Sequence, residues 1–100
     1  MSIISVHATV FAKEGKEEEV KQHLLGLLGP TRAEKGCINY DLHQSTDPGK
    51  KGDFIFYENW ENQECFNGHL NAPHVKEFLG KADDLLKEMV GISTWINIGK

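Results

Sequence analysis

An α+β fold, with helices covering one face of a single antiparallel sheet, is predicted by three features of the sequence. Four short stretches are rich in β-branched and aromatic residues, two longer stretches have apolar residues at helical spacing, and glycine or Pro–Gly separates them. Their order is β-α-β-β-α-β, so the second and third strands follow each other directly. The 100 residues indicate one domain, spanning residues 1–100.

The first strand and the first helix follow from the apolar pattern near the N-terminus. Residues 3–12 alternate in type, as expected of a strand with one buried face. The apolar face consists of Ile4, Val6, Ala8 and Val10. Residues 16–34 are predicted to form a helix because apolar residues recur every three or four positions. Gly29-Pro30 is predicted to end or bend this helix.

A β-hairpin is predicted in the middle of the chain. Residues 37–45 and residues 54–60 both have the composition of strands. Residues 46–53 lie between them and contain Pro48-Gly49 and a second glycine, which favour turns. The two strands are therefore predicted to be antiparallel neighbours joined by a long, mobile loop.

The second helix is predicted to be broken in two. Asn62 is a suitable N-cap for a short helix through Leu70, and Pro73 is suited to the first turn of the next helix. The apolar stripe of that next helix consists of Val75, Phe78, Leu79, Ala82, Leu85, Leu86 and Met89. Gly91 ends it, and residues 92–99 are predicted to form the last strand.

This order of elements is that of the ferredoxin-like fold, in which both helices cover the same face of the antiparallel sheet. The other face is expected to carry Phe11, Trp95 or their alternating neighbours. A sheet face too apolar for water requires a partner. The sequence therefore predicts a homodimer formed sheet against sheet.

Charge and composition argue against nucleic-acid and membrane partners and favour a cytoplasmic location. The net charge of −4 leaves no electrostatic basis for a nucleic-acid or anionic-membrane partner. No stretch approaches the ~20 apolar residues of a membrane span, and the N-terminal segment lacks the features of a signal peptide. Cys37 and Cys65 lie outside any CxxC motif. We therefore expect a cytoplasmic protein with both thiols reduced.

Two segments carry a resemblance to a known family. GCINYDLHQSTDP at residues 36–48 joins a Gly-Cys opening to a His-x-Ser ending. FIFYENWENQECFNGHLNAPHVKEFL at residues 54–79 contains Glu-x-Trp-Glu, followed by His-Leu-x-x-Pro-His. These patterns resemble the antibiotic biosynthesis monooxygenase family, and the KEGKEEEV stretch extends the resemblance over essentially the whole chain.

The resemblance implies a ferredoxin-like protomer that pairs into a dimeric α/β barrel. It also implies oxidation of an aromatic quinol- or phenol-like compound by molecular oxygen, without a metal, flavin or other cofactor. Related branches degrade haem or isomerise a phosphorylated sugar derivative. Two alternatives to the monooxygenase therefore stay open: an isomerase of a small phosphorylated carbonyl metabolite, and a protein that binds a small ligand without turnover.

Cofactor-free oxygenation requires a base, an oxyanion donor and a dry aromatic pocket, because oxygen reacts readily only with the deprotonated substrate. His69 is the expected base, since imidazole titrates near neutral pH. Trp60, which the resemblance places in the pocket, is expected to stack on the substrate. His74 or His7 is the expected oxyanion donor. Each of these residues has an alternative role in packing or in capping a helix end.

Three residues are expected to contact the substrate: His7, Tyr40 and Phe78. Tyr40 shares strand parity with Ile38 and Leu42, so it is predicted to face the helices. No metal site is expected, because His69 and His74 are five positions apart across a helix break, unlike known zinc spacings.

Overall fold

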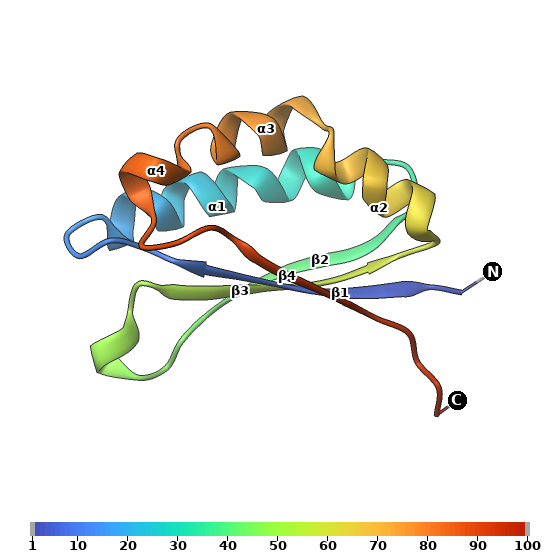
Figure 1. The fold of residues 1–100 in the computed structure, drawn as a ribbon, viewed down its shortest axis with the longest axis horizontal. Helices are drawn as coiled ribbons and strands as arrows, with labels where there is room; N and C mark the ends of the chain where they lie inside the picture. The colour runs from blue at the N-terminus through green and yellow to red at the C-terminus, as the bar shows by residue number, and fades with distance from the viewer. Residues whose placement is uncertain (1, 100) are drawn as a thin grey trace.

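The computed structural model describes residues 2–99 and shows the predicted α+β, ferredoxin-like arrangement. An antiparallel sheet with strand order β2-β3-β1-β4 is covered on one face by the α-helices (Figure 1). The strands are β1 (Ile4–Phe11), β2 (Cys37–Gln44), β3 (Asp53–Trp60) and β4 (Gly91–Trp95). The helices are α1 (Glu17–Arg32), η1 (Pro48–Lys50, a 3-10 turn), α2 (Gln63–Leu70), α3 (Pro73–Leu79) and α4 (Ala82–Leu85). Every helix among residues 2–99 is too short or too polar to cross a bilayer.

The buried core lies between the sheet and the helices, and β1 runs through its centre. This strand pairs antiparallel with β3 on one side and with β4 on the other. Val6, Ala8 and Val10 are buried beneath the helices, which confirms the predicted apolar face of β1. Burying these apolar side chains, two of them the β-branched Val6 and Val10, on the pleated surface is the main local reason that this segment forms a strand.

Helix α1 continues through Gly29-Pro30 to Arg32, close to the predicted range of residues 16–34, so Gly29-Pro30 does not end the helix. Pro30 removes one backbone donor from the helix. Thr31, the next residue, is fully buried, and the packing of the last turn offsets that loss. Gly36 then makes the turn into β2 with a φ of +81°, and a Cβ at this position would collide with Cys65 Sγ.

Strands β2 and β3 form the predicted antiparallel hairpin, with an irregularity that alternation alone did not reveal. The pairing register shifts between Cys37 and Asn39. A β-bulge adds one residue to a strand and redirects the neighbouring side chain. Ile38 is consequently 51% exposed, whereas Tyr40 is 3% exposed and faces the helices. The predicted orientation of Tyr40 is confirmed, and that of Ile38 is wrong.

The predicted long helix after Pro73 is divided into α3, α4 and an extended segment. Leu86 is extended (φ −112°, ψ 147°) and forms an isolated β-bridge with Ala12, just beyond β1. Pairing with the end of β1 therefore replaces the last helical turn. Met89 is 77% exposed, so its assignment to the apolar stripe is wrong. Strand β4 also ends earlier than predicted, at Trp95.

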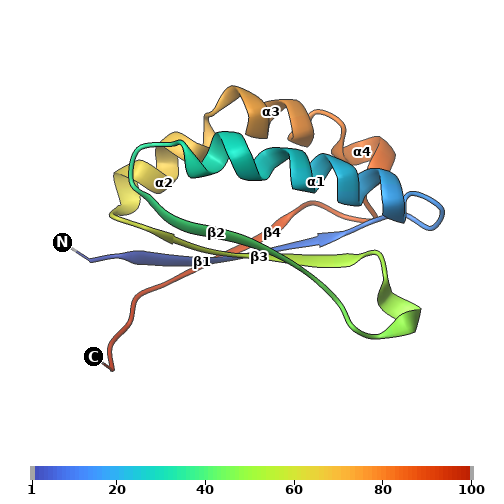
Figure 2. The same cartoon turned by 180° about the vertical axis from the view of Figure 1, so that it is seen from behind.

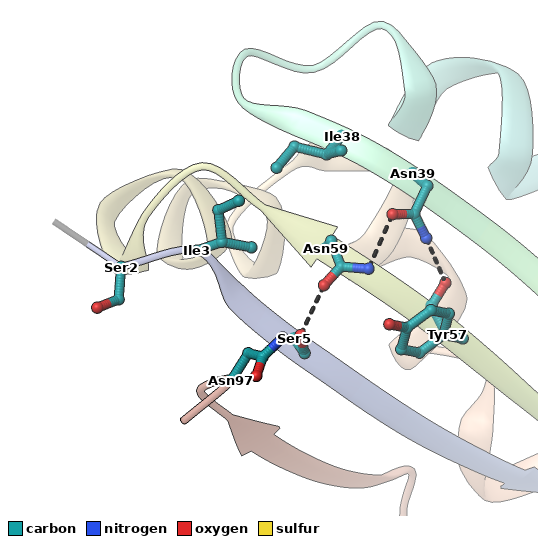
Figure 3. Close-up of a pocket in the computed structure, with 8 residues that line it drawn as sticks. All are labelled: Ser2, Ile3, Ser5, Ile38, Asn39, Tyr57, Asn59 and Asn97. Carbon is teal, nitrogen blue, oxygen red and sulfur yellow. Dashed lines mark hydrogen bonds between the residues drawn. The ribbon is translucent and has the colours of Figure 1, made fainter. Parts of the chain in front are cut away.

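The uncovered face of the sheet is mixed in polarity rather than apolar, and none of the α-helices in residues 2–99 lies over it (Figures 1 and 2). Ser5 Oγ donates a hydrogen bond to Asn59 Oδ1 (2.6 Å), and Asn59 Nδ2 donates to Asn39 Oδ1 (2.9 Å). Figure 3 shows this ladder across β1, β3 and β2, beside a surface hollow of about 250 Å³. Trp95 is 59% exposed, as expected of this face, but Phe11 is partly covered.

Candidate functional site

A cavity between the sheet and the helices is the candidate functional site. Its floor is the covered face of β1, β2 and β3, and α2 and α3 supply much of its roof. A water molecule can reach about 50 Å³ of its interior. Most of the lining is aliphatic or aromatic, and the polar lining residues are Tyr40, Glu58 and His69. Leu79 and Ile92 also line the cavity and are 40% and 46% exposed, so its mouth lies between α3 and β4.

His69 is held against this cavity by the last turn of α2 and is 4% exposed. Its Nδ1 lies 2.8 Å from Oε2 of Glu34, which follows α1. Because a carboxylate can only accept a hydrogen bond, Nδ1 carries the proton and Nε2 keeps its lone pair. Burial lowers the pKa of His69, although the hydrogen bond to Glu34 opposes this effect. The neutral ring can therefore accept a proton at Nε2, as a general base must.

His74 lies behind His69 and does not line the cavity. Its Nε2 is 2.9 Å from Oε2 of Glu34 and 3.2 Å from Oγ1 of Thr31. Its side chain is 22% exposed, toward a separate hollow on the helix side. The geometry gives His74 the role of fixing Glu34 and gives no support to a direct hydrogen bond from His74 to a ligand in the cavity.

Glu34 is a site residue that the sequence analysis missed, and nothing in the sequence placed it near either histidine. Ligand atoms of Glu34, His69 and His74 lie within 4.8 Å of one another, so this set could hold a metal ion. The spacing of the two histidines alone did not reveal such a set. Both contacts of the Glu34 oxygen have ordinary hydrogen-bond lengths, and two N–H donors account for them.

Glu58 is a second ionisable group of the cavity, and it too was not among the expected site residues. It is 2% exposed on β3, and Trp60 Nε1 donates a hydrogen bond to its Oε1 (2.9 Å). Burial raises the pKa of Glu58 to about 7, and the negative charge of Glu34 adds to this rise, while the Trp60 hydrogen bond opposes it. Strand alternation places Glu58 on the face of Phe56 and Trp60, so the sequence did contain the signal.

The three expected aromatic residues all lie close to the cavity, but only two of them line it. Tyr40 stacks on Phe56, with ring centroids 4.6 Å apart, and meets the His69 ring edge-on at 5.4 Å. Phe78 lines the cavity from α3. Trp60 is 0% exposed, packs 4.8 Å from the His69 ring and is not part of the lining. Trp60 therefore supports Glu58 and His69 from behind instead of forming a stacking wall.

His7 lies on the uncovered face of the sheet, where its ring contacts Tyr57 (5.3 Å) and Trp95 (6.4 Å). The sheet separates it from the cavity, so the structure gives no support to a contact between His7 and a substrate bound beside His69. Alternation placed His7 on the face opposite Val6 and Ala8. The helices cover the Val6 face, and this fact assigns His7 to the other side of the molecule.

Replacing Glu58 with glutamine is expected to remove a pH dependence of stability. The folded protein holds the Glu58 proton more tightly than the unfolded chain does. The stabilisation of the folded state by protonated Glu58 is therefore complete below about pH 4.5 and is lost as the pH rises through about 7. The pKa difference corresponds to about 3 kcal/mol.

Urea unfolding of the wild type and of Glu58→Gln, at about pH 5 and about pH 8, measures this loss directly. Glu61→Gln is the matched control, because Glu61 is exposed just beyond the same strand. The stability difference between wild type and Glu58→Gln should change with pH, and that between wild type and Glu61→Gln should not. Equal pH profiles for all three proteins would contradict burial of a protonated Glu58.

Known proteins resemble this chain over most of its length. A Synechocystis sp. protein named "Uncharacterized protein sll1783" is 30% identical over 92% of this chain, which spans only 61% of that relative. The Mycobacterium tuberculosis protein named "Putative monooxygenase Rv0793" is 26% identical, over 92% of this chain and 88% of its own length. The crystal structure of PA3566 from Pseudomonas aeruginosa matches with a TM-score of 0.90 and 29% identity, covering 99% of this chain and 97% of that chain. The profile of the family described as antibiotic biosynthesis monooxygenase matches residues 3–81, and the chain therefore belongs to this family.

Proposed function

We propose that this protein is a monooxygenase that oxidises a phenol- or quinol-like aromatic compound with molecular oxygen, using His69 as the general base. The observation that carries the proposal is the state of His69: one ring nitrogen is held by Glu34, and the residue lines an apolar cavity. Family membership and the name of the Mycobacterium relative support the reaction class.

The chemistry follows from removal of one proton. His69 Nε2 takes a proton from the ring hydroxyl, or from the enol form of an anthrone, and leaves an electron-rich anion. The anion transfers one electron to oxygen, and the resulting radical pair combines to form a carbon–oxygen bond. The peroxide takes the proton back from His69, and the resulting hydroperoxide loses water, together with the hydrogen on the same carbon, to leave a carbonyl group. One oxygen atom thus enters the product and the other leaves as water. The apolar lining excludes bulk water from these steps.

The volume and the lining of the cavity limit the size and the charge of the substrate. At about 50 Å³ it is smaller than typical ligand pockets, which measure roughly 300–1,000 Å³, so an aromatic ring must displace side chains at the mouth. Leu79 and Ile92, which are exposed there, are the side chains that such a ring meets first. Among residues 2–99 the lining contains no lysine or arginine, so a phosphorylated metabolite finds no cationic partner there.

Oxygen consumption by the purified protein, with a panel of hydroquinones and anthrones, tests the proposal. We expect uptake well above the rate without protein, and one atom of isotopically labelled oxygen in the product. An anaerobic incubation is the matched control. Uptake without incorporation would indicate an oxidase, and proton exchange without uptake would indicate an isomerase. Binding without any reaction would indicate a protein that binds a ligand without turnover.

We further propose that two copies pair through their uncovered sheet faces. Tyr57 and Trp95 are 40% and 59% exposed on this face, and all residues of β4 are exposed. Sedimentation analysis should show a dimer that Trp95→Asp dissociates. Leu25→Asp, at a 42%-exposed position on α1, should leave it intact. A monomeric wild type would contradict the pairing.

A further inference from the structure

The cavity presents a carboxyl group that the proposed base does not use. Glu58 lies on the floor of the cavity, and its Oε1 is occupied by the Trp60 N–H. Within the described part of the chain, Oε2 of Glu58 has no hydrogen-bond partner. It is not one of the fully buried polar atoms without a partner, so part of its surface is accessible. This oxygen is therefore available to a ligand that enters beside His69.

The charges around Glu58 determine which form of the carboxyl group can serve a ligand. Its charged or titratable neighbours are Glu34 after α1, Cys37 and Tyr40 on β2, and His69 on α2, and none of them is a permanent cation. An ionised Glu58 would repel an anionic ligand in this apolar space. A protonated Glu58 would instead donate a hydrogen bond and stabilise the anion.

We propose that protonated Glu58 donates a hydrogen bond from Oε2 to the oxyanion that forms when His69 takes the substrate's proton. The site thus selects an acidic phenol or enol that is bound as its anion between an imidazolium and a neutral carboxyl group. The substrate proton moves to His69 Nε2, and the Glu58 proton stays on Glu58. This role rests on the proposed function, and it fills the position that neither His74 nor His7 can reach.

Two further observations support this assignment. The raised pKa of Glu58 keeps a large fraction of this group protonated near neutral pH. The Trp60 N–H fixes the carboxyl group through the other oxygen, so Oε2 is positioned before the ligand arrives. A donor that is already oriented in a water-poor site stabilises an oxyanion more than the same donor does in water.

Binding of 4-nitrophenol, whose anion absorbs visible light, tests the proposal without any turnover. The titration is done anaerobically with the wild type, Glu58→Gln and Glu58→Leu, across the range from about pH 6 to about pH 9. In the wild type we expect the probe to bind as the anion, with an affinity for that anion that falls as Glu58 loses its proton. Glu58→Gln keeps an N–H donor and an acceptor for Trp60, so it should bind the anion without this fall.

Glu58→Leu removes the donor and should weaken anion binding about 10- to 100-fold, as expected for a hydrogen bond to a charged group. If Glu58→Leu does not fold, the pH profile of Glu58→Gln still decides the matter. Equal anion binding by wild type and Glu58→Leu, the same pH dependence in Glu58→Gln, or no binding by the wild type would overturn the proposal. The expected binding pattern in a protein without oxygen uptake would uphold the anion site and overturn only the monooxygenase reaction.

Discussion

Replacing His69 with alanine is expected to lower the turnover rate for the aromatic substrate by about 10²- to 10⁴-fold, the range that a positioned general base contributes. The variant loses the imidazole of His69, a residue that lines the cavity, while the apolar side chains of the lining remain. We therefore expect kcat to fall far more than KM changes. Steady-state oxygen consumption measures both quantities.

Three controls separate a lost base from a lost fold. His69→Asn places an amide N–H near the position of imidazole Nδ1, so it should keep the hydrogen bond to Glu34 and still be inactive. His43→Ala, at an exposed position on β2, should retain full activity. Added imidazole should restore part of the activity of His69→Ala, because the vacated space can admit it. Near-normal turnover in both His69 variants would assign the proton transfer to another group.

Replacing Trp60 with alanine is expected to destabilise the protein by about 3–5 kcal/mol, the usual cost of removing a buried tryptophan. Trp60 is 0% exposed, packs against Phe66 and His69, and donates its N–H to Glu58. The variant therefore gains an internal void and leaves the Glu58 carboxyl group without its donor. Small domains have only about 5–15 kcal/mol of total stability, so this loss is large. Urea unfolding measures it.

Activity lost in Trp60→Ala is therefore not evidence that Trp60 touches the substrate. Trp60→Phe is the informative companion, because it refills most of the space and removes only the N–H. It should be more stable than Trp60→Ala and should bind an anionic ligand with an altered pH dependence, since Glu58 loses its fixed orientation. A Trp60→Ala protein of normal stability and low activity would contradict the packing role and restore direct stacking.

Glu34 and Glu58 give the cavity its acid–base character, although both lay outside the expected set of residues. Glu34 fixes the tautomer of His69, and Glu58 supplies a carboxyl group on the opposite layer of the cavity. In the proposed mechanism both are needed, because the base requires an oriented ring and the anion requires a hydrogen-bond donor. That mechanism divides the site between a helix layer that would take up the proton and a sheet layer that would hold the negative charge.

The sequence by itself determined the order of elements, the apolar face of β1 and the hairpin of β2 and β3. It also determined the N-cap of α2, where the Asn62 side chain accepts a hydrogen bond from the Cys65 N–H at 2.9 Å. These features depend on side-chain periodicity and on local backbone chemistry, which are properties of neighbouring residues. The orientation of Tyr40 and the position of Glu58 on the face of Trp60 belong to the same class. Strand parity is local information, and a residue's face follows from it wherever the strand is regular.

The tertiary structure alone decided which of these residues meet. Glu34 reaches His69 and His74 across 35 and 40 residues of chain, and no local pattern encodes a contact of that span. The bulge at Ile38 and the pairing of Leu86 with Ala12 likewise override local preference, because they satisfy backbone groups in a neighbouring segment. The sequence made His69 the expected base and His7 an expected substrate contact in the same pocket. The sheet lies between them, and only the packing of the helices onto one of its faces made His69 part of the cavity.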